Sequence, residues 1–342
     1  MNLKVLYHGP LWVGSTSLQR LRAFQQLDDV TAVGLDTGAR VGNSSNIWHR
    51  IRWKLRWPAD VLEENRRLID AARQGRPDIV IIDNSKVISR RTLRALRDKG
   101  VKRLIYYTPD DVVAKHNLSF PLKHTFPEWD IVFTTKTFNV PELQSMGVRR
   151  PVLVGKSYDP DLHLQMEQAD VGDEYEKYDV VFVGTYEKER CVSINALADA
   201  GFRVVVYGSD KGGWTREYLR PTIELRKSVF AHDYGAAWHT GKTALCFLRK
   251  INRDRITQRT MEIAAMARPM VAERTDEHDQ NFVDGVEYLG FSDDVELVEQ
   301  VRLLLADPDR RYAMGQAARL RCETSGYSTL DRARQMLSII QI

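Results

Sequence analysis

The stretch Asp254–His278 reads DRITQRTMEIAAMARPMVAERTDEH, and it predicts a loop, a helix, a short strand and a charged turn. The helix is expected to begin at Thr257 or Gln258. Pro269 ends it, because the residue before a proline is disfavoured in the helical region. Residues 270–272 then predict a short buried strand. The polar run after it would lie at that strand's carboxyl end, where open α/β sheets bind their ligands.

Two kinds of side chain are expected at the start of this helix. Arg259 and Thr260 suit a phosphate, because the free N–H groups and the dipole of a helix start both favour an anion. Glu262, one turn inside, can accept hydrogen bonds from a sugar diol. An anion-binding group beside a diol-binding group predicts a nucleotide-sugar site. An ordinary amphipathic helix with solvated charges remains the alternative.

The same stretch resembles the donor-site segment of CgeB-like glycosyltransferases. The resemblance is carried by Arg259, Thr260, Glu262, Ile263 and Ala265, by the strand after Pro269, and by Glu273, Arg274, Thr275, Glu277, His278 and Phe282. It extends over nearly the whole chain and is most specific over residues 254–291. The resemblance implies the GT-B fold, in which two Rossmann-like domains face each other across a cleft.

Many GT-B enzymes carry two acidic residues eight positions apart in this segment. Here Asp254 and Glu262 have that spacing, with Asp where Glu is usual. The resemblance therefore implies that both residues belong to the donor-binding site.

The composition is that of an ordinary globular protein. Its 342 residues suggest about two domains, and a formal net charge of +4 does not argue for binding to nucleic acid. Cys191, Cys246 and Cys322 are widely spaced, which predicts buried thiols in a reducing compartment. We see no signal peptide and no apolar run near the roughly 20 residues of a membrane span. We therefore expect a cytoplasmic protein.

Strands alternate with helices along residues 1–157, which predicts a parallel, doubly wound α/β sheet. The expected strands of this half are residues 3–7, 30–35, 77–83, 103–108, 130–134 and 152–154. The loop 8–16 lacks the full dinucleotide fingerprint, so no nicotinamide or flavin site is expected. Either an acceptor pocket or a plain connection is compatible with this loop.

A second α/β domain is expected to follow a linker. Residues 158–177 are acidic and poor in structure signals, which predicts the linker. The strand pattern then restarts over residues 178–325, the expected donor domain. The last helix, within residues 326–342, is expected to cross back to the first domain, as it often does in the family that the chain resembles.

Three positions are candidates for binding the diphosphate together with the Thr260 backbone. Gly184 permits close approach of a ligand to the backbone, and Arg190 offers a bidentate fork to an anion. Arg259 is the third. A surface charge on a helix is the alternative interpretation of Arg190.

Tyr207 and Gly208 end a strand of the second domain, where the nucleobase would lie, although Tyr207 also suits the core. GT-B enzymes generally use side chains and a helix N-terminus, rather than a metal, to stabilise the leaving diphosphate. The resemblance thus implies no metal site and no cofactor, with the nucleotide sugar as donor substrate.

The only argument that the sequence offers for a general base is position. Asp110 and Asp111 follow a strand of the first domain, and adjacent carboxylates can raise one another's pKa, as a base requires. A turn or a helix cap is the competing interpretation. Asp83 also follows a strand, and His8 is a weaker candidate.

Residues 47–57, IWHRIRWKLRW, combine tryptophans with basic side chains. Ile47, Ile51 and Leu55 share one face of an expected helix. Such a segment suits an anionic membrane interface or an acidic acceptor. The alternative is a surface helix that packs its tryptophans on its own domain. The candidate acceptor or membrane residues are Trp48, Arg52, Trp53 and Arg56.

Three functions compete. The favoured one is a glycosyltransferase that moves a sugar from a nucleotide-diphosphate sugar to a glycan, lipid-linked or protein acceptor, with peripheral contact to an anionic membrane. The second is a sugar-nucleotide epimerase or hydrolase on the same fold. The third is a non-catalytic nucleotide- or glycan-binding protein.

Overall fold

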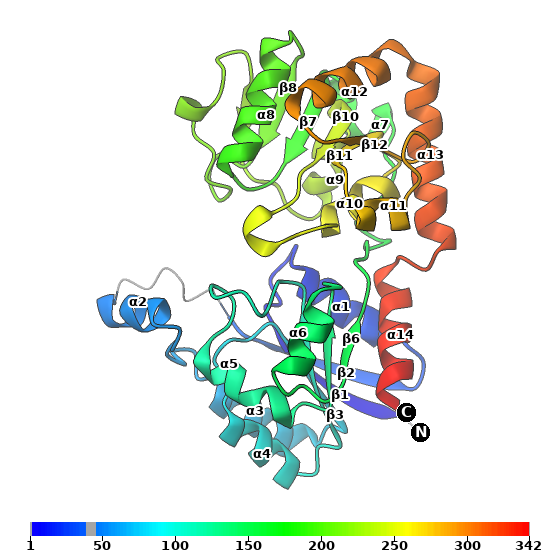
Figure 1. The fold of residues 1–342 in the computed structure, drawn as a ribbon. Helices are drawn as coiled ribbons and strands as arrows, with labels where there is room; N and C mark the ends of the chain where they lie inside the picture. Colours follow the sequence, from blue (N-terminus) through cyan, green and yellow to red (C-terminus); the bar gives the residue numbers. More distant parts are fainter. Residues whose placement is uncertain (1, 39–45, 342) are drawn as a thin grey trace. The chain divides into compact units, whose positions relative to one another are not determined.

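The computed structural model describes residues 2–38 and 46–341, and the chain divides into two compact units. Unit 1 comprises Met1–Gly155 and Thr329–Ile342, and unit 2 comprises Lys156–Ser328. Each unit contains one six-stranded sheet (Figure 1). All strand pairings between the described strands are parallel, so the prediction of parallel α/β sheets is confirmed.

The sheet of unit 1 has the strand order β2-β1-β3-β4-β5-β6. The bounds are β1 Leu3–Gly9, β2 Val30–Asp36, β3 Ile79–Asp83, β4 Arg103–Thr108, β5 Ile131–Thr134 and β6 Pro151–Leu153. The order reverses between β1 and β3, and such a switch point opens a crevice at the carboxyl ends of the two strands. A ligand site in unit 1 is therefore expected at the ends of β1, β3 and their neighbours.

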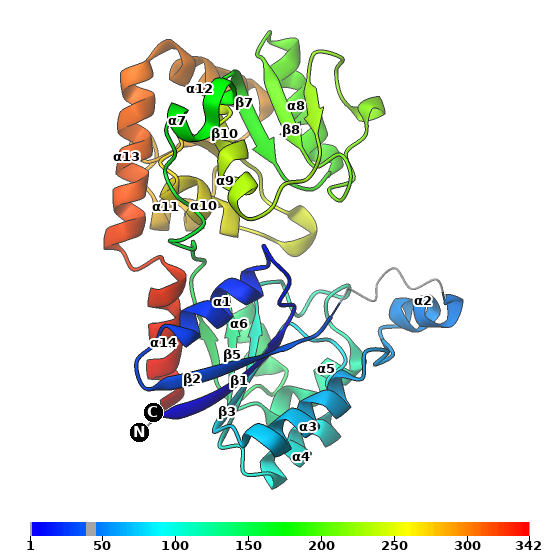
Figure 2. The ribbon, with the colours of Figure 1, turned by 180° about the vertical axis from the view of Figure 1, so that it is seen from behind.

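Helices cover both faces of this sheet. They are α1 Thr16–Gln25, α3 Glu64–Gly75, α4 Arg90–Asp98, α5 Phe120–Thr125, α6 Asn139–Ser145 and α14 Thr329–Gln341. The C-terminal helix α14 packs beside α1 (Figure 2). Its Ala333, Met336 and Ile340 share one apolar cluster with Phe24 of α1. The chain end therefore contributes to the core of unit 1.

The sheet of unit 2 has the strand order β12-β11-β10-β7-β8-β9, with its switch point between β10 and β7. The strand bounds are β7 Tyr178–Val183, β8 Val204–Tyr207, β9 Glu224–Arg226, β10 Gly241–Cys246, β11 Met270–Glu273 and β12 Leu289–Phe291. The helices are α7 Gln168–Val171, α8 Lys188–Asp199, α9 His232–Trp238, α10 Gln258–Ala265, α11 Asp276–Asn281, α12 Asp294–Ala306 and α13 Pro308–Thr324. The residues 158–177 group with this unit and contain α7.

The stretch Asp254–His278 forms helix α10 and strand β11, as its pattern predicts. Thr257 caps α10 by accepting a hydrogen bond from the backbone N–H of Thr260. The expected charged turn after β11 is instead the short helix α11, because Thr275 caps it by accepting from the N–H of His278. The three cysteines are buried and free, as expected.

Candidate functional site

Three glycines meet where β7 and β8 end in unit 2. A Cβ on Gly208 would lie 2.4 Å from the carbonyl oxygen of Gly184, and a Cβ on Gly212 would lie 2.9 Å from it. The indole Nε1 of Trp214 donates to the same oxygen at 2.9 Å. This packing excludes side chains at Gly208 and Gly212, and it fixes the backbone at Gly184.

Arg190 of α8 and Arg259 of α10 share an unusual feature beside this turn. The Nε of each guanidinium is buried and has no hydrogen-bond partner in the described part of the chain. Burial lowers the pKa of Arg190, and the positive charge of Arg259 lowers it further, so the two cations lie close together. The two arginines are candidates to bind an anion through these unfilled donors, in addition to Glu187, which lies 3.5 Å from a terminal nitrogen of Arg190.

The terminal nitrogens of Arg190 are already fixed. One donates to the carbonyl oxygen of Thr185 at 3.0 Å and the other to that of Leu248 at 3.1 Å. The Arg190 side chain is 4 % exposed, so the alternative of a solvated surface charge does not describe it.

Arg259 lies against Gly184. A Cβ on Gly184 would be 3.2 Å from the Arg259 Cζ, and burial lowers the pKa of this arginine. The nearby Tyr234 and Glu262 more than offset that effect, so the net shift of its pKa is upward. Arg259 therefore remains a cation in this half-buried position.

Glu262 is held from two sides. The Tyr234 hydroxyl donates to Glu262 Oε2, and His163 Nε2 lies 3.8 Å from Glu262 Oε1. The backbone N–H of Asp159 donates to His163 Nδ1 at 2.8 Å, so the proton of a neutral His163 is on Nε2, facing Glu262. Each oxygen of a carboxylate can accept more than one hydrogen bond, so Glu262 keeps acceptor capacity for a ligand.

Thr260 is fully buried and connects α10 to α11. Its hydroxyl pairs with His278 Nε2 at 2.9 Å, and His278 Nδ1 donates to the Glu273 carbonyl oxygen at 2.7 Å. The Thr260 backbone N–H donates to Thr257 Oγ1 at 3.3 Å. The predicted phosphate-binding N–H of Thr260 is therefore already used by the cap.

Asp254 and Tyr207 belong to other networks. Asp254 accepts a hydrogen bond from Asn252 at 3.1 Å. The Tyr207 carbonyl oxygen accepts from the Gly184 N–H at 3.1 Å, but its ring is buried in the core and its hydroxyl accepts from Arg226 at 3.0 Å. In unit 2, the structure brings Gly184, Gly208, Arg190, Arg259 and Glu262 together.

A second polar cluster lies at the carboxyl ends of β1 and β3 in unit 1. His8 Nε2 lies 3.4 Å from Glu64 Oε2, and the Ser85 hydroxyl donates to the same oxygen at 2.7 Å. Burial raises the pKa of Glu64 to about 7 and lowers the pKa of His8 to about 4. The sequence did not single out Glu64, because acidic residues are common in the first turn of a helix, where the helix dipole stabilises them.

The two adjacent acids of unit 1 have different surroundings. Asp111 is fully buried, and its Oδ1 accepts from Asn139 Nδ2 at 2.9 Å and from the Ala114 N–H at 3.3 Å. Asp110 is half-buried and accepts from Asn84 Nδ2 at 3.0 Å. Of the pair, Asp110 is the one with a partly accessible side chain.

Asp83, the further candidate, is buried in an ion pair. Arg20 donates to its Oδ2 at 2.6 Å, and the Tyr7 hydroxyl donates to the same oxygen at 2.6 Å. This geometry points to a structural role for Asp83.

Helix α2, Ile47–Lys54, contains no buried residue. Trp48 is 69 % exposed and Trp53 is 43 % exposed, so these tryptophans do not pack into the core of their own unit. Arg52 Nε donates to the Trp57 carbonyl oxygen at 3.2 Å, and Arg56 Nε donates to that of Leu118 at 2.8 Å. The helix thus presents both tryptophans and cations to its surroundings.

Comparison with known proteins agrees with this architecture. Residues 190–338 match the family model described as glycosyl transferase-like. The chain has the GT-B fold. No match was found among curated proteins.

Solved structures similar to this chain share its fold at low sequence identity. The Anabaena protein HepE in complex with UDP-glucose has a TM-score of 0.68 at 10 % identity, and 99 % of each chain is covered. A glycosyltransferase from Rickettsia africae has a TM-score of 0.68 at 12 % identity, with 99 % of this chain and 98 % of that chain covered. Sucrose-phosphate synthase from Thermosynechococcus elongatus has a TM-score of 0.66 at 12 % identity, with the same coverage.

Among the described residues of this chain, no helix has both the length and the apolar character needed to cross a membrane.

Proposed function

We propose that this chain is a glycosyltransferase, and that it transfers a sugar from a nucleotide-diphosphate sugar held by unit 2. The observation that supports this proposal is the pair of unfilled, buried Nε donors of Arg190 and Arg259 beside Gly184. A diphosphate would fill both donors and offset the mutual repulsion of the two guanidinium groups. The CgeB-like resemblance of residues 254–291 is part of the same proposal.

We propose that side chains, and no bound metal or further cofactor, stabilise the leaving diphosphate. Arg190 and Arg259 supply positive charge where negative charge develops as the glycosidic bond breaks, which is the requirement of electrostatic catalysis. Turnover in the presence of a chelator should then equal turnover without it. Loss of activity on chelation and its recovery with a divalent cation would contradict this part of the proposal.

Glu262 is proposed to accept hydrogen bonds from a diol of the donor. The Tyr234 hydroxyl and His163 hold its carboxylate in place, so binding a diol would not require reorganisation of this side chain. Preorganised groups bind without the cost of immobilising a flexible side chain.

The acceptor is proposed to lose its proton to Asp110, the partly accessible acid at the end of β4. We propose a glycan or lipid-linked acceptor, and peripheral contact of α2 with an anionic membrane. This contact is supported by the exposed tryptophans of α2 and by Arg50, Arg52 and Lys54, which are exposed as well. Tryptophan and basic residues together favour the interface of an anionic bilayer.

Calorimetric titration with UDP, GDP, ADP, CMP and dTDP tests the donor site. UDP is the first choice because the similar HepE structure contains UDP-glucose. Arg259→Ala should weaken binding of the preferred nucleotide by about 1.5–3 kcal/mol, the usual contribution of a hydrogen bond to a charged group. Glu262→Ala should weaken binding of the nucleotide sugar.

Arg255→Ala provides the matched control, because Arg255 is an exposed neighbour whose partner is Asp276. It should bind nucleotide as the wild type does. Wild-type affinity in both Arg259→Ala and Glu262→Ala would refute the proposed site.

An assay with nucleotide sugars and no acceptor tests the competing activities. Rapid epimerisation or hydrolysis under these conditions would favour the epimerase or hydrolase. Nucleotide binding without turnover under any condition would favour a binding protein.

A further inference from the structure

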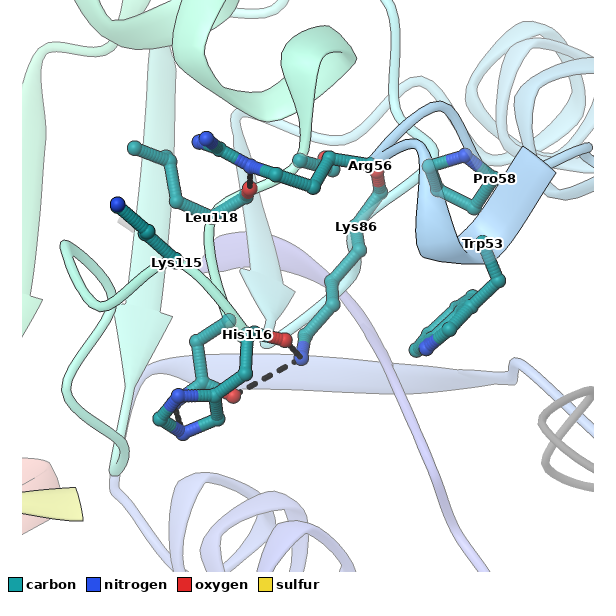
Figure 3. A pocket seen from close by; sticks show the side chains of 9 residues that line it. Trp53, Arg56, Pro58, Lys86, Lys115, His116 and Leu118 are labelled. Atoms are coloured by element: carbon teal, nitrogen blue, oxygen red, sulfur yellow. Dashed lines mark hydrogen bonds between the residues drawn. The ribbon is translucent and has the colours of Figure 1, made fainter. Parts of the chain in front are cut away.

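A small cavity of about 40 Å³ lies in unit 1 beside α2 (Figure 3). It is lined by Trp53, Arg56, Pro58, Lys86, Lys115, His116, Asn117, Leu118 and Ser119. Three of these residues are permanent cations, and none is an acid. By the space that a water molecule needs, the cavity has room for about three waters, which is similar to the size of a phosphate group.

The cations of this cavity are held in position. Lys86 Nζ donates to Asn117 Oδ1 at 3.0 Å and lies 5.6 Å from the centre of the Trp53 ring. Arg56 Nε donates to the Leu118 carbonyl oxygen at 2.8 Å, and the Arg56 backbone has a φ of 60° (Figure 3). A left-handed φ is uncommon outside glycine and asparagine, so the chain turns sharply at the residue that brings its guanidinium to the cavity.

Lys115 completes the cationic lining from the loop before α5. Its side chain is exposed and has no partner within residues 2–38 and 46–341. Two cations with hydrogen-bond partners, Lys86 and Arg56, and the exposed Lys115 therefore surround the same small space.

The apolar surface next to the cavity is exposed in the described structure. Ile47, Trp48, Trp53 and Leu55 are 63 %, 69 %, 43 % and 64 % exposed. Residues 46–58 contain no acid. A basic surface that also exposes tryptophan is complementary to an interface that is both anionic and apolar, which is the chemistry of an anionic bilayer.

We propose that this cavity binds the phosphate group of a membrane-anchored acceptor lipid, while α2 lies in the headgroup region around it. This inference rests on the proposed membrane contact of α2 and adds a phosphate-bearing lipid as the acceptor class. Trp53 belongs to both surfaces, because it lines the cavity and is also exposed on α2. The phosphate would bind at the same place where the tryptophan enters the interface.

Vesicle binding by the full chain tests the source of the phosphate. Phosphatidylcholine vesicles would contain either phosphatidic acid, a phosphomonoester, or phosphatidylglycerol, a phosphodiester, at matched surface potential. The wild type should bind the phosphomonoester vesicles more tightly. Lys115→Gln and Lys86→Gln should abolish this preference, whereas Arg50→Gln should weaken binding to both vesicles by about fivefold, the effect of one basic group near a bilayer.

Soluble inorganic phosphate tests the cavity without a membrane. The protein would be labelled with fluorotryptophan, and Trp53→Phe would identify the fluorine resonance of Trp53. Phosphate should shift this resonance in the wild type and in Arg50→Gln, and the shift should be lost in Lys115→Gln. Nucleotide affinity should stay unchanged in Lys115→Gln. The test of the cavity is therefore independent of the test of the donor site.

Two outcomes would overturn the inference. If phosphate does not move the Trp53 resonance and the vesicles show no phosphomonoester preference, the cavity is not a phosphate site. If phosphate moves the resonance but the wild type ignores both vesicles, the lipid source and the membrane contact of α2 are both wrong.

Discussion

The guanidinium of Arg259 packs directly against Gly184. A Cβ at Gly184 would lie 3.2 Å from both Cζ and a terminal nitrogen of Arg259. The same Cβ would approach Phe182 Cζ to 2.8 Å. The glycine after β7 therefore permits the close approach of the cation on α10. This contact joins the end of β7 to α10, the helix within the stretch Asp254–His278.

Gly184→Ala should weaken nucleotide binding with little effect on the fold. The added methyl group has to push the Arg259 guanidinium or the Phe182 ring, and a displaced cation no longer lies where a diphosphate would contact it. A loss of about tenfold in affinity, equivalent to about 1.4 kcal/mol, is expected by calorimetry.

Gly201→Ala serves as its control, since a Cβ there meets nothing within 4 Å. It has a φ of 90°, so it should lose stability but bind nucleotide normally while folded. Equal nucleotide affinity in Gly184→Ala and the wild type would show that the approach of Arg259 to Gly184 does not matter for binding.

Asn substitutions of Asp110 and Asp111 should have different consequences. Asp110→Asn should lower turnover by about 10²–10⁴, the usual contribution of a general base, while donor binding persists. Asp111→Asn should instead lower the free energy of unfolding by about 1–3 kcal/mol, because its carboxylate accepts two hydrogen bonds in a fully buried place. Steady-state kinetics and urea unfolding of both variants separate the two roles. Normal turnover in Asp110→Asn would direct the search to Glu64 and His8.

Asp83→Asn should destabilise unit 1 strongly. The substitution leaves the buried guanidinium of Arg20 without its countercharge, and breaking a buried pair in this way costs about 3–5 kcal/mol. Asp199→Asn is a matched control, because Asp199 pairs with Arg220 on the surface and solvent screening leaves such a pair little effect on stability. Equal urea midpoints for the two variants would show that Asp83 does not stabilise the fold.

Alternation of apolar runs with helical patterns was sufficient to predict two parallel sheets, because a strand buried on both faces needs a continuous apolar sequence. Two short strands of unit 2 were not predicted. The three-residue strands β9 and β12 each pair with a single neighbour, so their residues carry little of that pattern.

Residues of the candidate site could be predicted only where their position at the start of a helix or the end of a strand indicates a binding role. Arg259 and Glu262 follow from the start of α10, and Gly184 follows from the end of β7. The Tyr234 and His163 partners of Glu262 come from distant segments, and no spacing in the sequence indicates them. The same holds for Glu64, whose pKa is raised mainly by burial beside β1 and β3, which no spacing in the sequence indicates.

Glu64 should make the stability of the wild type depend on pH. Burial raises its pKa to about 7 from 4.5, Asp60 adds to this shift, and Ser85 and Arg67 oppose it. The folded protein therefore binds this proton more tightly than the unfolded chain does. Stability from this group is complete below pH 4.5, falls as the pH rises towards 7, and is lost above about pH 7.

Glu64→Gln should remove this dependence, because glutamine stays neutral and its amide oxygen can still accept from Ser85. The variant should be more stable than the wild type at pH 8, by up to about 3 kcal/mol, and should show no such gain at pH 4. Burial lowers the pKa of His8 to about 4, so its titration affects stability only between about pH 4 and 6.5, and the comparison at pH 8 lies above that range. Urea unfolding of both proteins at pH 4, 6 and 8 measures this difference. A gain that is equal at all three pH values would mean that Glu64 does not titrate with a raised pKa in the folded protein.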